Sequence, residues 1–148
     1  MLRAPKFIQE WHMRKLIRSF QVVFVLSASQ MLYAQETGVT KPQLVLQELV
    51  RGMPQGAEQE IRIMKADFKP GDRTVFHTHR FPVAVYILSG AFTLELEGKA
   101  PKVIKAGEGF VEPPNVKMTG FNRSTSEALH LVIFYVGDPG TPFLDPIH

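Results

Sequence analysis

Two histidines near the middle of the chain, His77 and His79, are the residues best suited to chemistry. Residues two apart on a β-strand point to the same side of it, with their Cα atoms about 7 Å apart. Two imidazoles placed in this way can converge on one metal ion or on one polar group of a small molecule. A lone His-x-His pair has little specificity, so its meaning depends on the segments that position it.

The segments around this pair predict short β-strands. Residues 91–97 alternate apolar Phe92, Leu94 and Leu96 with polar neighbours, as a half-buried strand does. Eleven glycines and eleven prolines supply frequent turns, and no helix is expected after residue 34. We expect strands over residues 44–50, 59–68, 74–79, 83–89, 91–97, 101–105, 110–112, 117–121 and 127–136, followed by an extended tail over 137–148. About nine short strands predict an all-β fold, a closed barrel or jelly roll.

The spacing of histidines, glycines and prolines resembles the paired motifs of the cupin superfamily. The matching residues are Gly71, His77, His79 and Gly90 in the first motif, and Gly107, Pro113 and Asn122 in the second. The resemblance covers roughly residues 61–136. It implies a cupin-like jelly-roll barrel that often binds a divalent metal ion inside and has oxygenase, isomerase or sugar-related chemistry, or none.

Two of the four metal ligands that the resemblance implies are replaced. The glutamate expected four residues after His79 is Val83, and the histidine expected five residues after Pro113 is Met118. The exchange makes the site softer and less anionic. Neither Val83 nor any nearby residue is expected to restore the missing negative charge, so Mn²⁺ and Fe²⁺ should bind poorly and Cu(I) should bind best among likely ions. The motif's glycine two residues after Pro113 is Asn115, which can itself adopt a turn conformation.

Three interpretations of the barrel interior remain open. In the first, one transition-metal ion is bound by His77 and His79 together with Met118, His130 or water. In the second, the barrel binds a small molecule without a metal. In the third, it is a structural or dimerisation module. The candidate ligand-binding residues are His77, His79, Val83, Val85, Phe92, Met118 and Phe121. Glu108 and Glu112, near the second motif, receive less weight as oxygen donors. No catalytic residue is assigned.

The first 34 residues have the layout of a removable signal peptide. Basic Arg14, Lys15 and Arg18 precede a seven-residue apolar run that is too short to span a membrane, and Ala34 suits the cleavage position. The true start could be Met13. We therefore expect an exported protein, periplasmic or secreted, with a flexible lead-in over residues 35–43, a barrel over 44–148 and no stable membrane insertion.

Charge and composition limit the kinds of partner that the protein can bind. Residues 1–34 carry five bases and one acid, whereas the remainder carries 12 bases and 13 acids. The body of the protein therefore has no bulk charge to attract nucleic acid. The absence of cysteine excludes disulfides and thiol catalysis. We expect a small-molecule ligand, and a homodimer formed through residues 44–50 or through the proline-rich tail.

Overall fold

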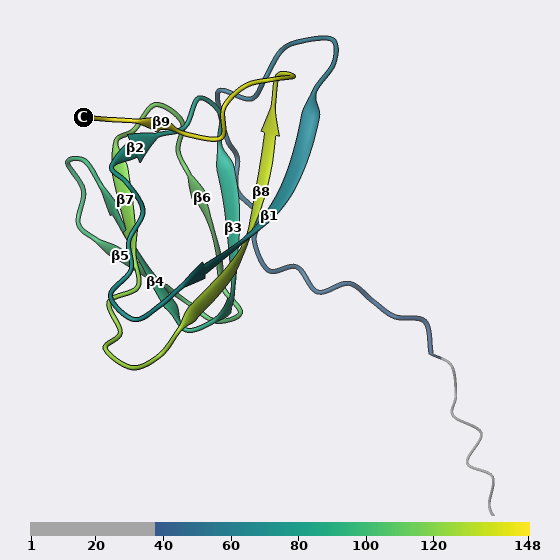
Figure 1. The fold of residues 1–148 in the computed structure, drawn as a ribbon. Coiled ribbons are helices and arrows are strands. Elements are labelled where there is room, and N and C mark those ends of the chain that lie inside the picture. Colours follow the sequence, from purple (N-terminus) through teal and green to yellow (C-terminus); the bar gives the residue numbers. More distant parts are fainter. Residues whose placement is uncertain (1–37) are drawn as a thin grey trace, which may run out of the picture. The chain divides into compact units, whose positions relative to one another are not determined.

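The computed structural model describes residues 38–148, in which two antiparallel sheets carry nine strands (Figure 1). The first sheet has the order β1 (Glu60–Phe68), β8 (Leu129–Gly137), β3 (Val83–Ser89) and β6 (Gly109–Glu112). The second has the order β5 (Lys102–Lys105), β4 (Ala91–Leu96), β7 (Met118–Phe121), β2 (His77–Thr78) and β9 (Asp145–Pro146). The predicted all-β class is confirmed. The predicted signal peptide, residues 1–34, lies outside the described residues.

The core forms where the inward faces of the two sheets meet. Alternate residues of β3, namely Val83, Val85 and Ile87, are buried, as the period of a strand requires. Ile87 packs in one apolar cluster with residues of both sheets, including Leu94 of β4 and Leu131 of β8. Burying each such side chain contributes about 1.5–3 kcal/mol. Within residues 38–148 there is no helix with the length and apolarity needed to cross a membrane.

Seven of the nine expected strands form within one or two residues of their predicted limits; the exceptions are residues 74–79 and 44–50. The strand expected over residues 74–79 is reduced to β2, and the expected extended tail contributes the short strand β9. The strand predicted over residues 44–50 is wrong, because this segment pairs with no other strand and its side chains are exposed. Its apolar residues indicated a strand, but apolar character alone provides no backbone partner.

Gly120 on β7 allows Phe92 to lie against the second sheet. A Cβ atom at position 120 would come within 2.2 Å of Cζ of the Phe92 ring, well inside any tolerable contact. The Phe92 side chain is buried and meets Phe68 of β1 edge to face, with ring centroids 6.0 Å apart. The missing side chain at Gly120 therefore makes room for an aromatic contact between the two sheets.

Asn122 ties three loop segments together from a buried position. Its Nδ2 atom donates hydrogen bonds to the carbonyls of Phe68, Lys69 and Glu127, over 2.8–3.2 Å. Its Oδ1 atom accepts from the backbone N–H of Ser124. Only 2% of the residue is exposed, so water cannot replace these partners.

We expect Asn122→Ala to lower the free energy of unfolding by about 2–4 kcal/mol, because buried carbonyls would lose their donor. Chemical denaturation monitored by circular dichroism measures this loss. Gln47→Ala, in the exposed segment before β1, is the matched control and should change stability by less than about 0.5 kcal/mol. Equal stability of Asn122→Ala and the parent protein would contradict the structural role of this side chain.

Candidate functional site

The two sheets enclose a cavity of about 130 Å³ with polar groups gathered at one side. His77 of β2, His79 just after it and Glu112 at the end of β6 supply ionisable side chains, and Thr74 adds a hydroxyl. The remaining walls are apolar and come from β1, β3, β4, β8 and the C-terminal tail: Ala66, Phe68, Val85, Phe92, Leu131, Ile133, Phe143 and Leu144. The cavity is thus a mostly apolar space with one polar corner.

Two backbone carbonyls fix the orientation of both histidine rings. His77 Nδ1 lies 2.7 Å from the carbonyl oxygen of Val75, and His79 Nδ1 lies 2.7 Å from that of Phe143. A carbonyl oxygen can only accept a hydrogen bond, so each Nδ1 carries the hydrogen. This tautomer leaves each Nε2 atom as the ring's free acceptor. Both Nε2 atoms then face one another across 3.1 Å.

The carboxylate of Glu112 joins the two imidazoles. Glu112 Oε2 lies 3.1 Å from His79 Nε2, and only 5% of Glu112 is exposed. Three acceptor atoms therefore converge in a buried place, with both ring hydrogens already donated elsewhere. Such a cluster is unfavourable unless a cation lies among the three atoms, either a proton or a metal ion.

Burial lowers the pKa of His77 below its ordinary value, and the neighbouring His79 lowers it further. The hydrogen bond to Val75 and the negative charge of Glu112 act in the opposite direction but do not cancel the effect of burial. His77 is therefore neutral at neutral pH, so its Nε2 lone pair is available to a ligand.

Imidazole nitrogens and carboxylate oxygens are common metal ligands, but their arrangement decides whether they can share an ion. Within residues 38–148, no group of three or more histidine, aspartate or glutamate side chains could hold a metal ion. His79 contacts both His77 and Glu112, and no ion pair joins the outer two in the described residues. The two 3.1 Å separations are hydrogen-bond distances. The three atoms therefore form a hydrogen-bonded chain centred on His79.

The C-terminal tail closes the cavity beside His79. Phe143 and Leu144 line the cavity, and the ring of Phe143 packs against His79 with centroids 4.8 Å apart. Strand β9 pairs with β2, and the Arg80 guanidinium makes two hydrogen bonds to the Asp145 carboxylate, at 2.9 and 3.0 Å. The tail thus both covers the site and supplies the carbonyl that orients His79.

Asn115 fixes His79 from the other side. Asn115 has φ +58°, a left-handed conformation that asparagine tolerates better than most residues. The turn directs its backbone N–H to the carbonyl of His79, at 2.7 Å. The sequence indicated a turn at Asn115, and the structure shows that this turn also positions a site residue.

The other predicted site residues lie in different places. Val83 is buried beside Val85 and Tyr135, and Met118 is buried in the main apolar cluster opposite His77, but neither lines the cavity. Phe121 lies outside the cavity wall, with the Arg123 guanidinium 4.4 Å from its ring centroid. Val85 and Phe92 line the cavity.

His130 does not share the site with His77 and His79. Its neighbours on β8, Leu129 and Leu131, are buried, so strand alternation turns His130 outward. There its Nδ1 atom pairs with the Asp67 carboxylate at 2.6 Å. The sequence left its direction open because the whole strand is apolar. Glu112, in contrast, lies in the site, although the sequence gives it little weight as an oxygen donor. Its position in the apolar segment Phe110–Glu112 indicated that its side chain could be buried.

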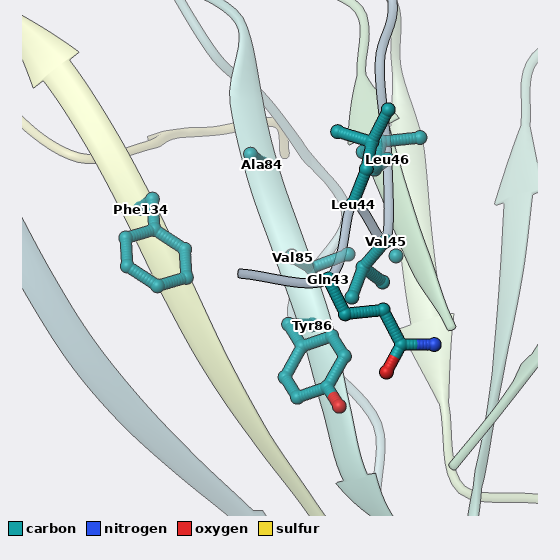
Figure 2. Close-up of a pocket in the computed structure, with 9 residues that line it drawn as sticks. Gln43, Leu44, Val45, Leu46, Ala84, Val85, Tyr86 and Phe134 are labelled. Atoms are coloured by element: carbon teal, nitrogen blue, oxygen red, sulfur yellow. The ribbon is translucent and has the colours of Figure 1, made fainter. Parts of the chain in front are cut away.

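A second cavity of about 380 Å³ lies on the outer side of β3 (Figure 2). Figure 2 shows Gln43, Leu44 and Val45 beside this strand, with Tyr86 projecting next to them. Apart from the glutamine amide and the tyrosine hydroxyl, its lining side chains are apolar, so this cavity offers little chemistry. The expected homodimer through residues 44–50 or the tail stays a prediction.

Comparison with known proteins agrees with this fold. Residues 64–134 match the family model described as the cupin domain. A cupin-like protein from Thermotoga maritima is 21% identical, with a TM-score of 0.51 over 59% of this chain and 64% of that one. A structure of DMSP lyases is 15% identical, with a TM-score of 0.51 over 60% of this chain and 44% of that one. An RmlC-like cupin from Shewanella frigidimarina is 25% identical, with a TM-score of 0.47 over 55% of this chain and 69% of that one.

The first of these matches spans less than two thirds of the Thermotoga maritima protein. Identities as low as those of the two structures at TM-score 0.51 show the fold alone. No curated protein sequence matches the chain. The family match and the strand order nevertheless lead to one conclusion: residues 64–134 of this chain form a cupin domain.

Proposed function

We propose that this protein binds a small molecule inside its barrel, next to an altered metal site. The observation that carries the proposal is the enclosed cavity of about 130 Å³, into which His77 and His79 present their Nε2 atoms. Apolar walls with a few convergent polar groups are typical of ligand sites. A purely structural barrel interior gains nothing from two buried imidazoles and a buried carboxylate, because apolar side chains pack there at lower cost.

The size of the cavity limits the ligand. By this measure one water needs about 10–15 Å³, so the space admits several water-sized groups. The ligand is therefore a small molecule, largely apolar, with one polar group directed at the histidines.

A metal-dependent enzyme is the second candidate function. The contact between His79 and Glu112 favours it, because a buried carboxylate beside an imidazole can also hold or move a proton at Nε2. Mass spectrometry after incubation with a bound small molecule distinguishes the two functions. An enzyme converts the molecule to a product, whereas a binding protein leaves it unchanged.

We expect Ala66→Leu to abolish ligand binding, because the larger side chain fills the cavity beside the histidines. The probes are short-chain alcohols, aldehydes, ketones and carboxylic acids of up to about four heavy atoms. Melting temperatures are measured with and without each probe, and binding raises them. At least one chemical class should stabilise the parent protein and leave Ala66→Leu unaffected.

The matched control is Ala106→Leu, which makes the same substitution in an exposed turn. It should respond to the probes as the parent protein does. If no class stabilises the parent protein, or if the same class stabilises Ala66→Leu equally, small-molecule binding in this cavity is refuted.

The C-terminal tail gives a second expectation. Asp145→Ala removes the paired hydrogen bonds to Arg80 and so loosens the tail over the cavity. Water screens an exposed pair of this kind, so its loss should act locally and not on the whole fold. The amide of Ile147, which donates to the carbonyl of Phe76, should therefore exchange its hydrogen faster than in the parent protein. Unchanged exchange at Ile147, or equal acceleration at Ala66 on β1, would contradict a local role of this ion pair.

We also propose export, with cleavage near Ala34. The basic stretch followed by a short apolar run supports it. N-terminal sequencing of protein recovered outside the cytoplasm should begin near Gln35. Recovery of the chain only in the cytoplasm, with an intact Met1 or Met13 terminus, would argue against export.

A further inference from the structure

We propose that the ligand of the cavity between the sheets is a small primary amine, bound in its ammonium form at the polar corner of His77, His79 and Glu112. The inference names the ligand class of this cavity and so rests on the proposed function. Three features of the molecule carry it: a corner that accepts hydrogen bonds, a buried negative charge and aromatic walls.

The polar corner accepts hydrogen bonds. The Nδ1 hydrogens of both histidines are donated to backbone carbonyls, so each ring presents its Nε2 atom to the corner. His77 is neutral and its Nε2 is therefore an acceptor, as are both oxygens of the Glu112 carboxylate. Within residues 38–148, the hydroxyl of Thr74 makes its hydrogen bond with the amide of Gly120 and with none of these atoms. A ligand that fits the corner must therefore donate hydrogen bonds.

A single hydrogen on His79 does not satisfy the corner. His79 Nε2 lies 3.1 Å from both His77 Nε2 and Glu112 Oε2. This nitrogen carries at most one hydrogen, so it can donate to one of its two neighbours and not fully to both. An ammonium group has three donors, as the lysine side chain does, and can supply the acceptor that remains.

The charge of Glu112 favours a cationic donor over a neutral one. Its side chain is 7% exposed, and its one ion-pair partner among the described residues is His79. Every lysine or arginine that forms an ion pair within residues 38–148 does so with another acid. A buried carboxylate is costly unless a positive charge accompanies it. An alkylamine is cationic at neutral pH, as the lysine side chain is, and so brings this charge with the ligand.

Aromatic rings in the cavity walls suit the same cation. Phe68 of β1, Phe92 of β4 and Phe143 of the C-terminal tail all line the cavity. Phe143 lies beside the polar corner, because its ring packs against His79 with centroids 4.8 Å apart. The face of an aromatic ring attracts an ammonium ion, most strongly where water is excluded. The walls are otherwise aliphatic, so the remainder of the amine is a short alkyl group.

A set of probes with one branched skeleton tests the inference: propan-2-amine, propan-2-ol, acetone and acetate. Their polar groups are, in this order, a cationic donor, a neutral donor, a neutral acceptor and an anionic acceptor. Each probe is titrated into the full chain, and its dissociation constant is measured by NMR. Propan-2-amine should bind at least about 10-fold more tightly than propan-2-ol, because its hydrogen bonds are charge-assisted. Acetone and acetate should bind more weakly than the alcohol.

Glu112→Gln keeps the size of the side chain, removes its charge and adds two N–H donors to the corner. This variant should bind propan-2-amine at least about 10-fold more weakly than the parent protein does, and so lose the preference for the amine over the alcohol. Glu127→Gln neutralises an exposed acid and is the matched control. It should bind both probes as the parent protein does.

Phe143→Leu removes the aromatic ring beside the corner and keeps the wall apolar. The preference for propan-2-amine over propan-2-ol should fall in this variant, because only the cation is attracted by the ring. A general change of cavity shape weakens both probes alike, so an unchanged preference would contradict an ammonium group beside this ring. Melting temperatures without a probe identify any variant that does not fold, in which case the four probes on the parent protein decide.

Two results would overturn the inference alone: acetone or acetate that binds as tightly as propan-2-amine, or a folded Glu112→Gln variant that keeps its preference for the amine. The proposed function survives either result if the probe that binds the parent protein does not bind Ala66→Leu. Amine binding that Ala66→Leu leaves unchanged would place the amine outside the cavity and overturn the inference as well. If no probe binds the parent protein, both the ligand class and the proposed function are refuted.

Discussion

Burying two imidazoles and a carboxylate in an apolar barrel obliges the fold to find a partner for every polar atom. The carbonyls of Val75 and Phe143 accept the two Nδ1 hydrogens, so the segment before β2 and the C-terminal tail both orient the histidines. The remaining acceptors can be satisfied only by an added proton or other cation. The hydrogen bonds of the site thus depend on where the tail is placed.

A few close contacts hold the residues that surround the site. Gly120 leaves room for the ring of Phe92, which forms one wall of the cavity. Asn122 holds the loops after β1 and before β8, the two strands that supply four further wall residues. The backbone N–H of Asn115 binds the carbonyl of His79, and the carbonyl of Phe143 in the tail binds its ring. The apolar walls are therefore held by loops as much as by the strands themselves.

Local pattern was sufficient to predict much of the fold. The alternation of Phe92, Leu94 and Leu96 defined β4, and strand parity together with the motif spacing placed His77 and His79 on one side. The pattern failed where tertiary contacts decide: residues 44–50 are apolar but have no strand to pair with. His130 on an apolar strand could not be oriented until its neighbours were seen to be buried.

Glu112 could not be placed from the sequence, because its role depends on which residue lies opposite it across the sheet. That pairing has a consequence for folding fidelity. A slip of one residue between β3 and β6 would reverse the faces of the shorter strand, exposing Glu112 and turning Val111 inward. The misaligned barrel would have an apolar corner and two histidines without their carboxylate. A chain misaligned in this way would keep its secondary-structure content but lose the buried contact between His79 and Glu112.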